Sequence, residues 1–348
     1  MNDATNDATN EATNERTTAM TPNTAPTAEA TLLLLDRDQV AALMHPKDVL
    51  QAVREAFVLH SRGEGRVFPV VREQLAGGGV FGIKAGAVPD QSLLGFKAAG
   101  FWSANRARGG EPHQATVMLV DPATGRPQCL IDGNAITTMR TGAAGGLGLI
   151  ELARADSTRV CVFGTGVQAR IQLGYALDLL PPLARVDYVS SSGARDTAFE
   201  AQFAQRCAIA PAADADDAVA QADIVITATP GRAPLFRADA VQPGTHLNCV
   251  GADTRGKREL PDGLLARARL FVDDHIQARQ IGELQWAPER ACTQLGDLLS
   301  GKEHAHRAPH DITVFDMTGL ALQDLAVARL LFERARAAHA GTSIAWPW

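Results

Sequence analysis

Short apolar runs alternate with helix-like segments between residues 158 and 272. The runs are uniformly apolar, which is the pattern of strands buried on both faces of a parallel sheet. Strands are predicted at Val160–Phe163, Val186–Val189, Ala222–Thr229, His246–Gly251 and Arg269–Val272, and helices at Arg170–Leu180, Arg195–Arg206 and Pro261–Ala266. This alternation of strand and helix predicts a doubly wound α/β sheet.

The first half of the chain follows a different pattern. A Leu-rich strand is expected at residues 32–35, a helix at Pro46–His60, and strand-like segments separated by Gly from Val67 to Leu130. A further helix is expected from Ala135 to Leu152. Strands joined by short Gly-containing turns are typical of an antiparallel sheet, so this half predicts an α+β domain.

The last predicted helix, Leu322–His339, is amphipathic, with Leu325 on its apolar face and Gln323 on its polar face. We expect it to return and pack on the first domain, which makes that domain discontinuous. The predicted organisation is therefore an α+β domain of residues 31–153 and 322–348, and a dinucleotide-binding domain of residues 154–321.

Residues 1–30 contain the repeat NDAT-NDAT-NEAT-NERT followed by a Thr/Pro/Ala-rich stretch. This segment has no apolar core sequence and is acidic, so it resembles neither a secretion signal nor a transit peptide. It cannot bury apolar surface, and we expect a disordered low-complexity tail without chemistry of its own.

Charge and cysteine content limit the classes of function. The net charge is −6, and the first thirty residues contribute −4 of it through five acidic residues and one Arg, so the remainder is nearly neutral. A basic face for nucleic acid is not supported, and no apolar run approaches the roughly 18–20 residues that span a bilayer. The five Cys are scattered without C-x-x-C spacing, which favours a reduced, cytoplasmic protein.

The most specific motif is GTGVQA, which follows the predicted strand Val160–Phe163. Gly164 allows a tight turn from strand to helix, Gly166 lets the backbone approach a pyrophosphate, and Ala169 lets the helix pack closely on the strand. Because further strands and helices follow it, this pattern predicts a dinucleotide site. We expect the cofactor to contact residues in several loops: Thr141, Gly164, Thr165, Gly166, Val167, Gln168, Ser191, Ser192, Arg195, Thr229, Val250 and Gly251.

The choice between NAD and NADP stays open at this point. The second strand ends in Val189-Ser190-Ser191-Ser192, without the Asp or Glu that binds the ribose 2′-hydroxyl of NAD. Ser191, Ser192 and Arg195 are able to accept a 2′-phosphate, which favours NADP slightly, although small polar residues also tolerate NAD.

Several basic residues of the first domain lie between apolar neighbours. A buried cation needs an anionic partner, and Arg presents a fork that matches a carboxylate. These residues predict a substrate with a carboxylate group: Arg72, Lys84, Lys97, His113 and Arg140. Each also has a structural alternative, such as an edge-strand ion pair for Arg72 or an extended, solvent-reaching side chain for Lys84.

Asp253 lies in the loop GADTRGKREL, after a strand whose carboxyl end faces the predicted cofactor site. It is a candidate for proton transfer near the reacting carbon, or for holding a substrate amino group. The cluster His304, His306 and His310 has a faint resemblance to metal-ligand spacing, but its polar context predicts a loop, and we expect no metal site.

Seven segments of the chain together resemble the ornithine cyclodeaminase/mu-crystallin family over about residues 32–335. These segments are FPVVRE, GFKAAG, HQATVMLVDPATGRP, IDGNAITTMRTGAA, VFGTGVQA, HLNCVGADTRGKREL and TVFDMTGLALQDL. The resemblance implies a Rossmann cofactor domain, a homodimer joined through the substrate domain, and chemistry at the amino-bearing carbon of an amino or imino acid.

The resemblance also implies roles for individual residues. Arg72, Lys97 and Arg140 match the substrate-carboxylate and active-site cations, and Asp253 matches the catalytic aspartate, so Lys97 and Asp253 are the expected catalytic residues. The glycine loop matches the pyrophosphate site, and Thr229 lies near the nicotinamide edge.

The family contains cyclodeaminases, net reductases or dehydrogenases, and binding proteins. Asp253 argues against the ketimine-reductase branch, and together with Lys97 it favours a catalyst over a binding protein. Lys84 adds a cation where a diamino acid would need an anion, which favours a second substrate carboxylate. The expected reaction is NAD(P)H-dependent reduction of iminosuccinate to L-aspartate. Ornithine cyclodeamination to proline and alanine-type dehydrogenation remain the alternatives.

Overall fold

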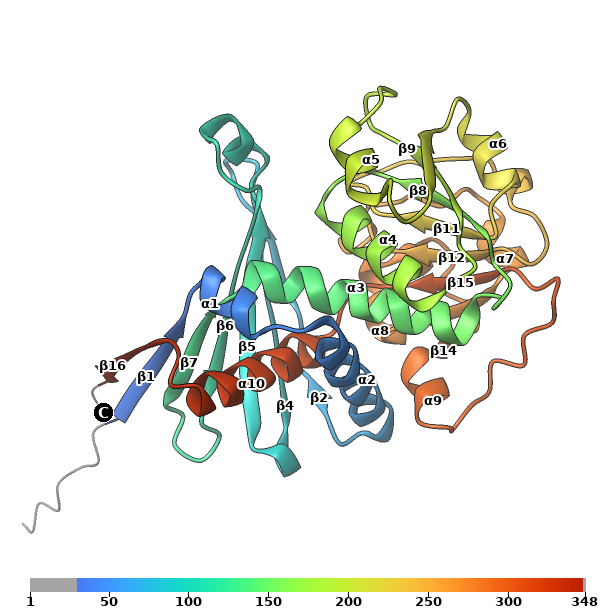
Figure 1. Ribbon diagram of the computed structural model, residues 1–348. Helices are drawn as coiled ribbons and strands as arrows, with labels where there is room; N and C mark the ends of the chain where they lie inside the picture. Colours follow the sequence, from blue (N-terminus) through green and yellow to red (C-terminus); the bar gives the residue numbers. More distant parts are fainter. Residues whose placement is uncertain (1–29, 347–348) are drawn as a thin grey trace, which may run out of the picture.

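The computed structural model describes residues 30–346, so the predicted tail lies outside the described residues except for Ala30, which begins the first strand. Two eight-stranded sheets organise this part of the chain (Figure 1). The first is mixed and the second is parallel, which confirms the predicted α/β fold with a Rossmann-like sheet.

The first sheet has the strand order β16-β1-β7-β6-β5-β4-β2, with β3 paired to β4. Its strands come from both ends of the described chain: β1 (Ala30–Leu35), β2 (Arg66–Val67), β3 (Val71–Gln74), β4 (Val80–Val88), β5 (Leu93–Phe101), β6 (His113–Val120), β7 (Pro127–Asp132) and β16 (Thr342–Trp346). The prediction of a purely antiparallel sheet was wrong, because β1 pairs with β7 in parallel. β1 and β7 are not consecutive strands of the chain, so no hairpin turn forces this pair to be antiparallel, whereas β6 and β7 are joined by a short turn and pair in antiparallel fashion.

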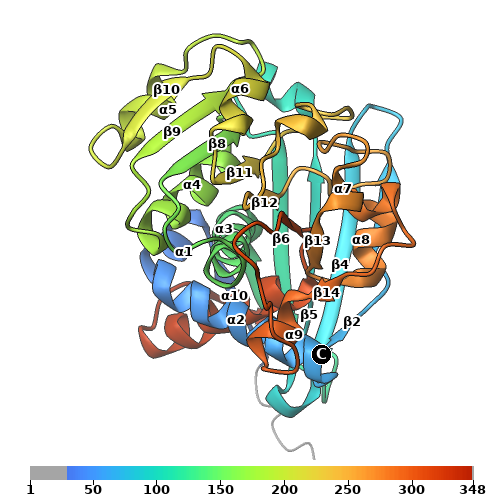
Figure 2. The same cartoon turned by 90° about the vertical axis from the view of Figure 1, so that its right-hand side faces the viewer.

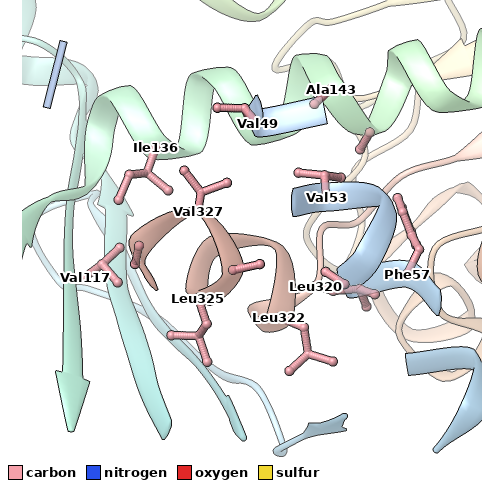
Figure 3. Packing of buried hydrophobic residues seen from close by; sticks show 14 of the residues in the cluster. Val49, Val53, Phe57, Val117, Ile136, Ala143, Leu320, Leu322, Leu325 and Val327 are labelled. Carbon is pink, nitrogen blue, oxygen red and sulfur yellow. The ribbon is translucent and has the colours of Figure 1, made fainter. Parts of the chain in front are cut away.

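Four helices accompany the first sheet: α1 (Arg37–Leu43), α2 (Pro46–Arg62), α3 (Gly133–Leu152) and α10 (Ala321–Ala337). Helix α10 packs against β4, β5 and β6, and α2 and α3 pack against α10. Figure 3 shows this core, in which Val327 of α10 points toward α3 and Leu325 points away from α3. The packing of α10 on this sheet is what the amphipathic pattern of the last helix predicted.

The second sheet has the order β10-β9-β8-β11-β12-β15-β13-β14, and all its pairs are parallel. Its strands are β8 (Arg159–Phe163), β9 (Arg185–Val189), β10 (Ala208–Pro211), β11 (Ile224–Thr227), β12 (His246–Cys249), β13 (Arg269–Val272), β14 (Thr293–Gln294) and β15 (Thr313–Asp316). The strand order reverses between β8 and β11, and dinucleotides bind at such a switch point.

The helices of this part are α4 (Val167–Leu179), α5 (Thr197–Phe203), α6 (Ala215–Ala220), α7 (Leu264–Arg267), α8 (His275–Ile281) and α9 (Leu295–Leu299). Local capping explains where they differ from the predicted ranges. Helix α5 begins after Asp196, whose side chain accepts a hydrogen bond from the Phe199 N–H, and α7 begins after Gly263 with φ +79°. Helix α4 begins earlier than predicted, directly after Gly166.

Several elements had no counterpart in the sequence prediction, among them three strands. Strand β15 has only four residues, yet it lies in the sheet interior between β12 and β13, and all four are buried. The edge strands β10 and β16 were also missed, because short runs at sheet edges carry little hydrophobic signal.

Helix α3 joins the two sheets, as Figures 1 and 2 show. Its glycines form close contacts with the parallel-sheet part: a Cβ at Gly148 would overlap the Phe315 ring, and one at Gly145 would overlap the Gln172 side chain. The Gln172 Nε2 donates to the Thr141 carbonyl over 2.8 Å, and the Asn248 Nδ2 donates to the Gly145 carbonyl over 3.0 Å. The glycines therefore fix how closely the two parts approach each other. Within residues 30–346, no helix combines the length and apolarity needed to cross a bilayer.

We predict that Gly148→Ala lowers the free energy of unfolding by about 1–3 kcal/mol, because the added methyl overpacks a buried aromatic contact. Gly174→Ala in α4 is the matched control, since a Cβ there meets nothing within 4 Å. That change is expected to be neutral or slightly stabilising. Denaturant unfolding of both variants tests this, and equal stability of the two would contradict the close-approach argument.

Candidate functional site

Two lysines face each other across neighbouring strands of the first sheet. Lys84 on β4 is the direct register partner of Lys97 on β5. Like charges at directly opposite positions repel, and Lys97 is only 4% exposed. The sheet therefore places two cations side by side where water can screen them little.

Asp324 on α10 provides the counter-charge for Lys97. The Lys97 Nζ donates to Asp324 Oδ1 over 2.8 Å and to Thr137 Oγ1 over 3.3 Å. Arg140 on α3 donates from Nε to the same Asp324 oxygen over 2.9 Å and from Nη1 to Gln323 Oε1 over 3.2 Å. One buried carboxylate thus holds two of the predicted substrate cations.

Lys84 contacts the loop between β15 and α10. Its Nζ donates to the carbonyls of Thr318 and Gly319, each over 2.7 Å. The same loop is fixed from the other side by Asp273, whose carboxylate accepts from the Thr318 hydroxyl over 2.8 Å and from the Gly319 N–H. Lys84 therefore links β4 to the loop that leads into α10.

Arg72 and Asp253 meet across the two parts of the chain. Arg72 Nη2 lies 3.5 Å from Asp253 Oδ2 and donates to Thr254 Oγ1 over 2.7 Å. Lys257 Nζ holds the other Asp253 oxygen over 2.7 Å. Asp253 remains 37% exposed, so a ligand can reach it.

These side chains line two adjoining cavities, of about 70 and 140 Å³. The first is bordered by Arg72, Lys84, Lys97, His113, Arg140 and Asp253, which are the predicted substrate and catalytic residues. The second is bordered by Thr141, Gln168 and Val250, predicted to face the cofactor, and shares His113, Arg140 and Asp253 with the first.

Burial and neighbouring charges shift the pKa values of the basic groups. Burial, helped by Arg140, lowers the pKa of Lys97 to about 7, and the same causes lower the pKa of Lys84 to about 8. Burial and nearby Lys97 also hold the pKa of His113 below its usual range, and its Nδ1 lies 3.0 Å from Asn134 Oδ1. Lys97 can therefore exchange a proton near neutral pH.

The pKa values of Asp253 and Asp324 are also lowered, in their case because neighbouring cations outweigh burial. Burial raises the pKa of Asp253, but the charges of Lys257 and Arg72 outweigh it and place that pKa well below its usual range. Burial likewise opposes ionisation of Asp324, and Arg140 and Lys97 reverse the effect. Asp253 is therefore a carboxylate at neutral pH, suited to accepting a hydrogen bond rather than donating a proton.

The glycine loop has the geometry that a pyrophosphate requires. Gly164 has φ +99°, and a Cβ there would lie 2.8 Å from the Ala228 carbonyl oxygen. Gly166 is the N-cap of the 13-residue helix α4 without a side-chain cap, and a Cβ there would meet nothing within 4 Å. Exposed N–H groups at a helix start attract a phosphate anion. The buried Oε1 of Gln168 has no hydrogen-bond partner within the described residues, which fits a site that a bound dinucleotide completes.

The ribose-binding region follows β9. Ser190 Oγ donates to the Ala194 carbonyl over 2.7 Å, and the Ala194 N–H donates to Ser192 Oγ over 3.2 Å, so these serines stabilise their own turn. Arg195 Nε donates to Glu200 Oε2 over 2.8 Å. That ion pair neutralises the cation expected to receive a 2′-phosphate.

The remaining predicted cofactor residues lie at the ends of β8, β11 and β12 or on α3. Thr165 accepts from Arg170 Nε at its carbonyl over 3.0 Å, and Val167 is 61% exposed at the start of α4. Thr229 and Gly251 both donate backbone N–H groups to Glu259. The histidines His304, His306 and His310 lie in an irregular loop, and no cluster of three His, Cys, Asp or Glu able to hold a metal occurs in residues 30–346.

Sequence reasoning assigned no role to Asp324, Gln323, Lys257 or Glu259. It also placed Gln323 on the polar face of the last helix, which was wrong, since Gln323 and Asp324 are 0% and 1% exposed. The available signal was that apolar residues flank them on both sides, from Ala321 to Ala328, because a helical segment that is apolar all round is buried all round. A helical pattern alone cannot show which buried polar side chain has a partner on another element.

We predict that Asp324→Asn destabilises the fold by about 3–5 kcal/mol, because it leaves Lys97 and Arg140 buried without their counter-charge. Asp48→Asn, which breaks the half-exposed ion pair with Arg334, is the control and should cost far less. Thermal or denaturant unfolding measures both. A loss for Asp324→Asn no larger than that for Asp48→Asn would rule out a structural role for the buried triad.

Comparison with known proteins identifies relatives of this chain. An iminosuccinate reductase of Paracoccus denitrificans is 33% identical over 327 residues, covering 90% of this chain and 98% of that protein.

Two solved structures are also similar. An archaeal alanine dehydrogenase dimer with bound NAD has a TM-score of 0.85 at 30% identity, covering 90% of this chain and 99% of that one. A Thermococcus litoralis Δ1-pyrroline-2-carboxylate reductase in complex with NADH and L-proline has a TM-score of 0.83 at 27% identity, with 90% and 100% coverage. The family profile matches residues 31–339, and the chain belongs to the ornithine cyclodeaminase/mu-crystallin family.

Proposed function

We propose that this chain reduces a small imino acid that carries two carboxylates, with iminosuccinate to L-aspartate as the reaction that the site fits best. At the level of reaction class, it is an NAD(P)-dependent oxidoreductase of C=N and CH–NH2 groups, like its relatives. The observation that supports this proposal most is that Lys84 and Lys97, on neighbouring strands, line one small cavity together with Arg72 and Arg140.

The charge around the cavities favours an anionic ligand. Four cations (Arg72, Lys84, Lys97 and Arg140) and two carboxylates (Asp253 and Asp273) border the cavities, a surplus of two positive charges if all are ionised. Lys257 and Asp324, which pair with bordering residues, carry opposite charges and leave this surplus unchanged. A dicarboxylate compensates this surplus, whereas a monocarboxylate leaves part of it unbalanced.

The carboxylates nearby are already engaged, which disfavours a diamino acid. Asp324 is held by Lys97 and Arg140, Asp253 by Lys257 and Arg72, and Asp273 by the Thr318–Gly319 loop. The distal ammonium of ornithine would have to compete with these partners. Cyclodeamination is therefore the second candidate, kept because the family includes it.

NAD is the proposed cofactor. The solved relatives hold NAD or NADH, and Arg195, which would favour NADP, is paired with Glu200. The glycine loop, the N-terminus of α4 and Gln168 would hold it, with Thr229, Val250, Gly251 and Thr141 toward the nicotinamide. When bound in reduced form, NADH supplies the hydride that adds to the imine carbon.

The protein's own groups then orient the substrate and provide the proton. Arg72 and Arg140 present guanidinium groups to the α-carboxylate, and Lys84 is placed for the second one. The Asp253 carboxylate accepts an N–H of the substrate and stabilises its protonated imine form. Lys97, with a pKa of about 7, supplies the proton that converts the neutral imine nitrogen into this form before the C=N bond becomes CH–NH2.

We also propose that the chain forms a homodimer, as the archaeal alanine dehydrogenase does. The proposed partners are otherwise limited to the cofactor and the small amino or imino acid.

A substrate panel tests the proposal. NADH and NADPH oxidation is followed with oxaloacetate, pyruvate or glyoxylate, each with ammonia, and with ornithine alone. We expect the highest kcat/KM for oxaloacetate plus ammonia with NADH. Proline formation from ornithine without net NADH change would instead establish the cyclodeaminase, and preference for pyruvate would establish the alanine-type enzyme.

Lys84→Met sharpens the same experiment. Loss of the Lys84 hydrogen bonds to the Thr318–Gly319 loop is expected to lower kcat/KM for every substrate. The informative quantity is therefore the ratio of kcat/KM values between two substrates. We expect kcat/KM to fall at least tenfold more for the oxaloacetate-derived imine than for the pyruvate-derived imine. An unchanged ratio would remove the electrostatic argument for a second carboxylate.

The pKa of Lys97 gives a pH prediction. The proton-donating form exists below the pKa, so kcat/KM for reduction should be level below about pH 7 and decline above it. Lys97→Arg cannot release its proton, so we expect a rate about 10²–10⁴-fold lower and loss of this decline. NADH affinity measured across the same pH range is the control, and a decline that persists in the variant would assign it to another group.

A further inference from the structure

The loop that carries Asp253 is closed by one buried carboxylate. It leaves the end of β12 at Gly251 and returns at Glu259, which is 0% exposed. Glu259 Oε2 accepts from the Gly251 N–H over 2.8 Å and from Thr227 Oγ1 over 2.7 Å. Its Oε1 accepts from the N–H and the hydroxyl of Thr229, each over 2.7 Å.

These four donors determine the charge state of Glu259. Burial raises its pKa, but each oxygen accepts one hydrogen bond from a backbone N–H, which can only donate, and one from a hydroxyl, and this pattern favours the ionised form. Glu259 is therefore present as a carboxylate. An uncharged amide at this position would offer one oxygen and an NH2 group that itself donates.

The hydrogen bonds of Glu259 connect the site to the cofactor edge of the sheet. Thr229 follows β11 and Gly251 follows β12, and both were predicted to contact the cofactor, Thr229 near the nicotinamide edge. Inside the closed loop, Lys257 donates to the Gly251 carbonyl over 3.1 Å and to Asp253 over 2.7 Å. The position of Asp253 thus depends on Gly251, and Gly251 depends on Glu259.

We propose that Glu259 is a positioning residue, which closes the 251–259 loop and sets Asp253 and Thr229 in place for the reaction. It acts through these groups and borders neither cavity. The part of the inference that concerns Asp253 rests on the function proposed above, whereas the closure of the loop does not.

A second buried glutamate offers a matched control. Glu283 Oε1 accepts the Glu259 N–H over 2.6 Å, and burial together with Asp316 raises the pKa of Glu283 to about 8. It is therefore largely protonated at pH 7, and a glutamine there preserves both its charge and its accepting oxygen. Glu259→Gln and Glu283→Gln make the same chemical change at two adjacent buried positions.

Three measurements on the full-length protein at pH 7 test the proposal. In Glu259→Gln we expect amide hydrogen exchange of residues 250–258 to rise at least tenfold and kcat to fall at least tenfold. Binding of ADP-ribose, which occupies only the glycine loop and ribose region, should stay within twofold of wild type. Glu283→Gln should stay within threefold of wild type in all three measurements.

Two outcomes would overturn the inference. Unchanged loop exchange with kcat within threefold of wild type would show that Glu259 does not hold the loop. Equal losses of ADP-ribose binding and of kcat would show a general structural role instead of positioning.

If Glu259→Gln does not fold, Thr227→Val removes one donor to Glu259 while leaving a side chain of similar size. We expect a few-fold rise in exchange of residues 250–258, and no rise would also overturn the inference. If wild type is inactive on every imino acid tested, the proposed function fails, but the exchange and ADP-ribose measurements still decide whether Glu259 closes the loop.

Discussion

The buried triad of Lys97, Asp324 and Arg140 is the interaction on which the site depends. Its members come from a strand, the last helix and the long connecting helix, so it forms only when these elements have assembled. Removing two cations from water is costly, and Asp324 compensates part of that cost. The remaining positive charge, increased by Lys84 opposite Lys97, is the basis for the proposed preference of the cavity for an anion.

Helix α3 makes the site continuous across the two sheets. Arg140 faces the substrate cavity and Thr141, the next residue, borders the cavity on the cofactor side. The glycines that follow let α3 lie close against α4 and β15, so the distance between the two halves is set by contact of the α3 backbone with side chains of α4 and β15. The residues proposed to contact the substrate and the cofactor thus lie next to each other on one helix, which suits the proposed reaction because it requires a short transfer distance.

Much of the fold and part of the site could be predicted from the sequence. The apolar runs identified β8, β9, β11, β12 and β13, since strands buried on both faces need no alternation. The cations Arg72, Lys84, Lys97 and Arg140 were identified because a charge between apolar neighbours is costly unless it has a partner. Strand β15 was missed because four residues after a polar loop carry almost no periodic signal, and Asp324 and Glu259 were missed because their partners lie far away in sequence.

The sequence by itself determined the glycine turn, the parallel sheet and the types of charged group available, because these follow from local conformation and from the spacing of apolar residues. Only the tertiary structure decided which charges neutralise one another. It paired Asp324 with Lys97 and Arg140, gave Lys84 two backbone carbonyls, and paired Arg195 with Glu200. Electrostatic energies depend on distance and burial in space, so the ionisation of Lys97 and the selectivity of the cavity emerge only after folding.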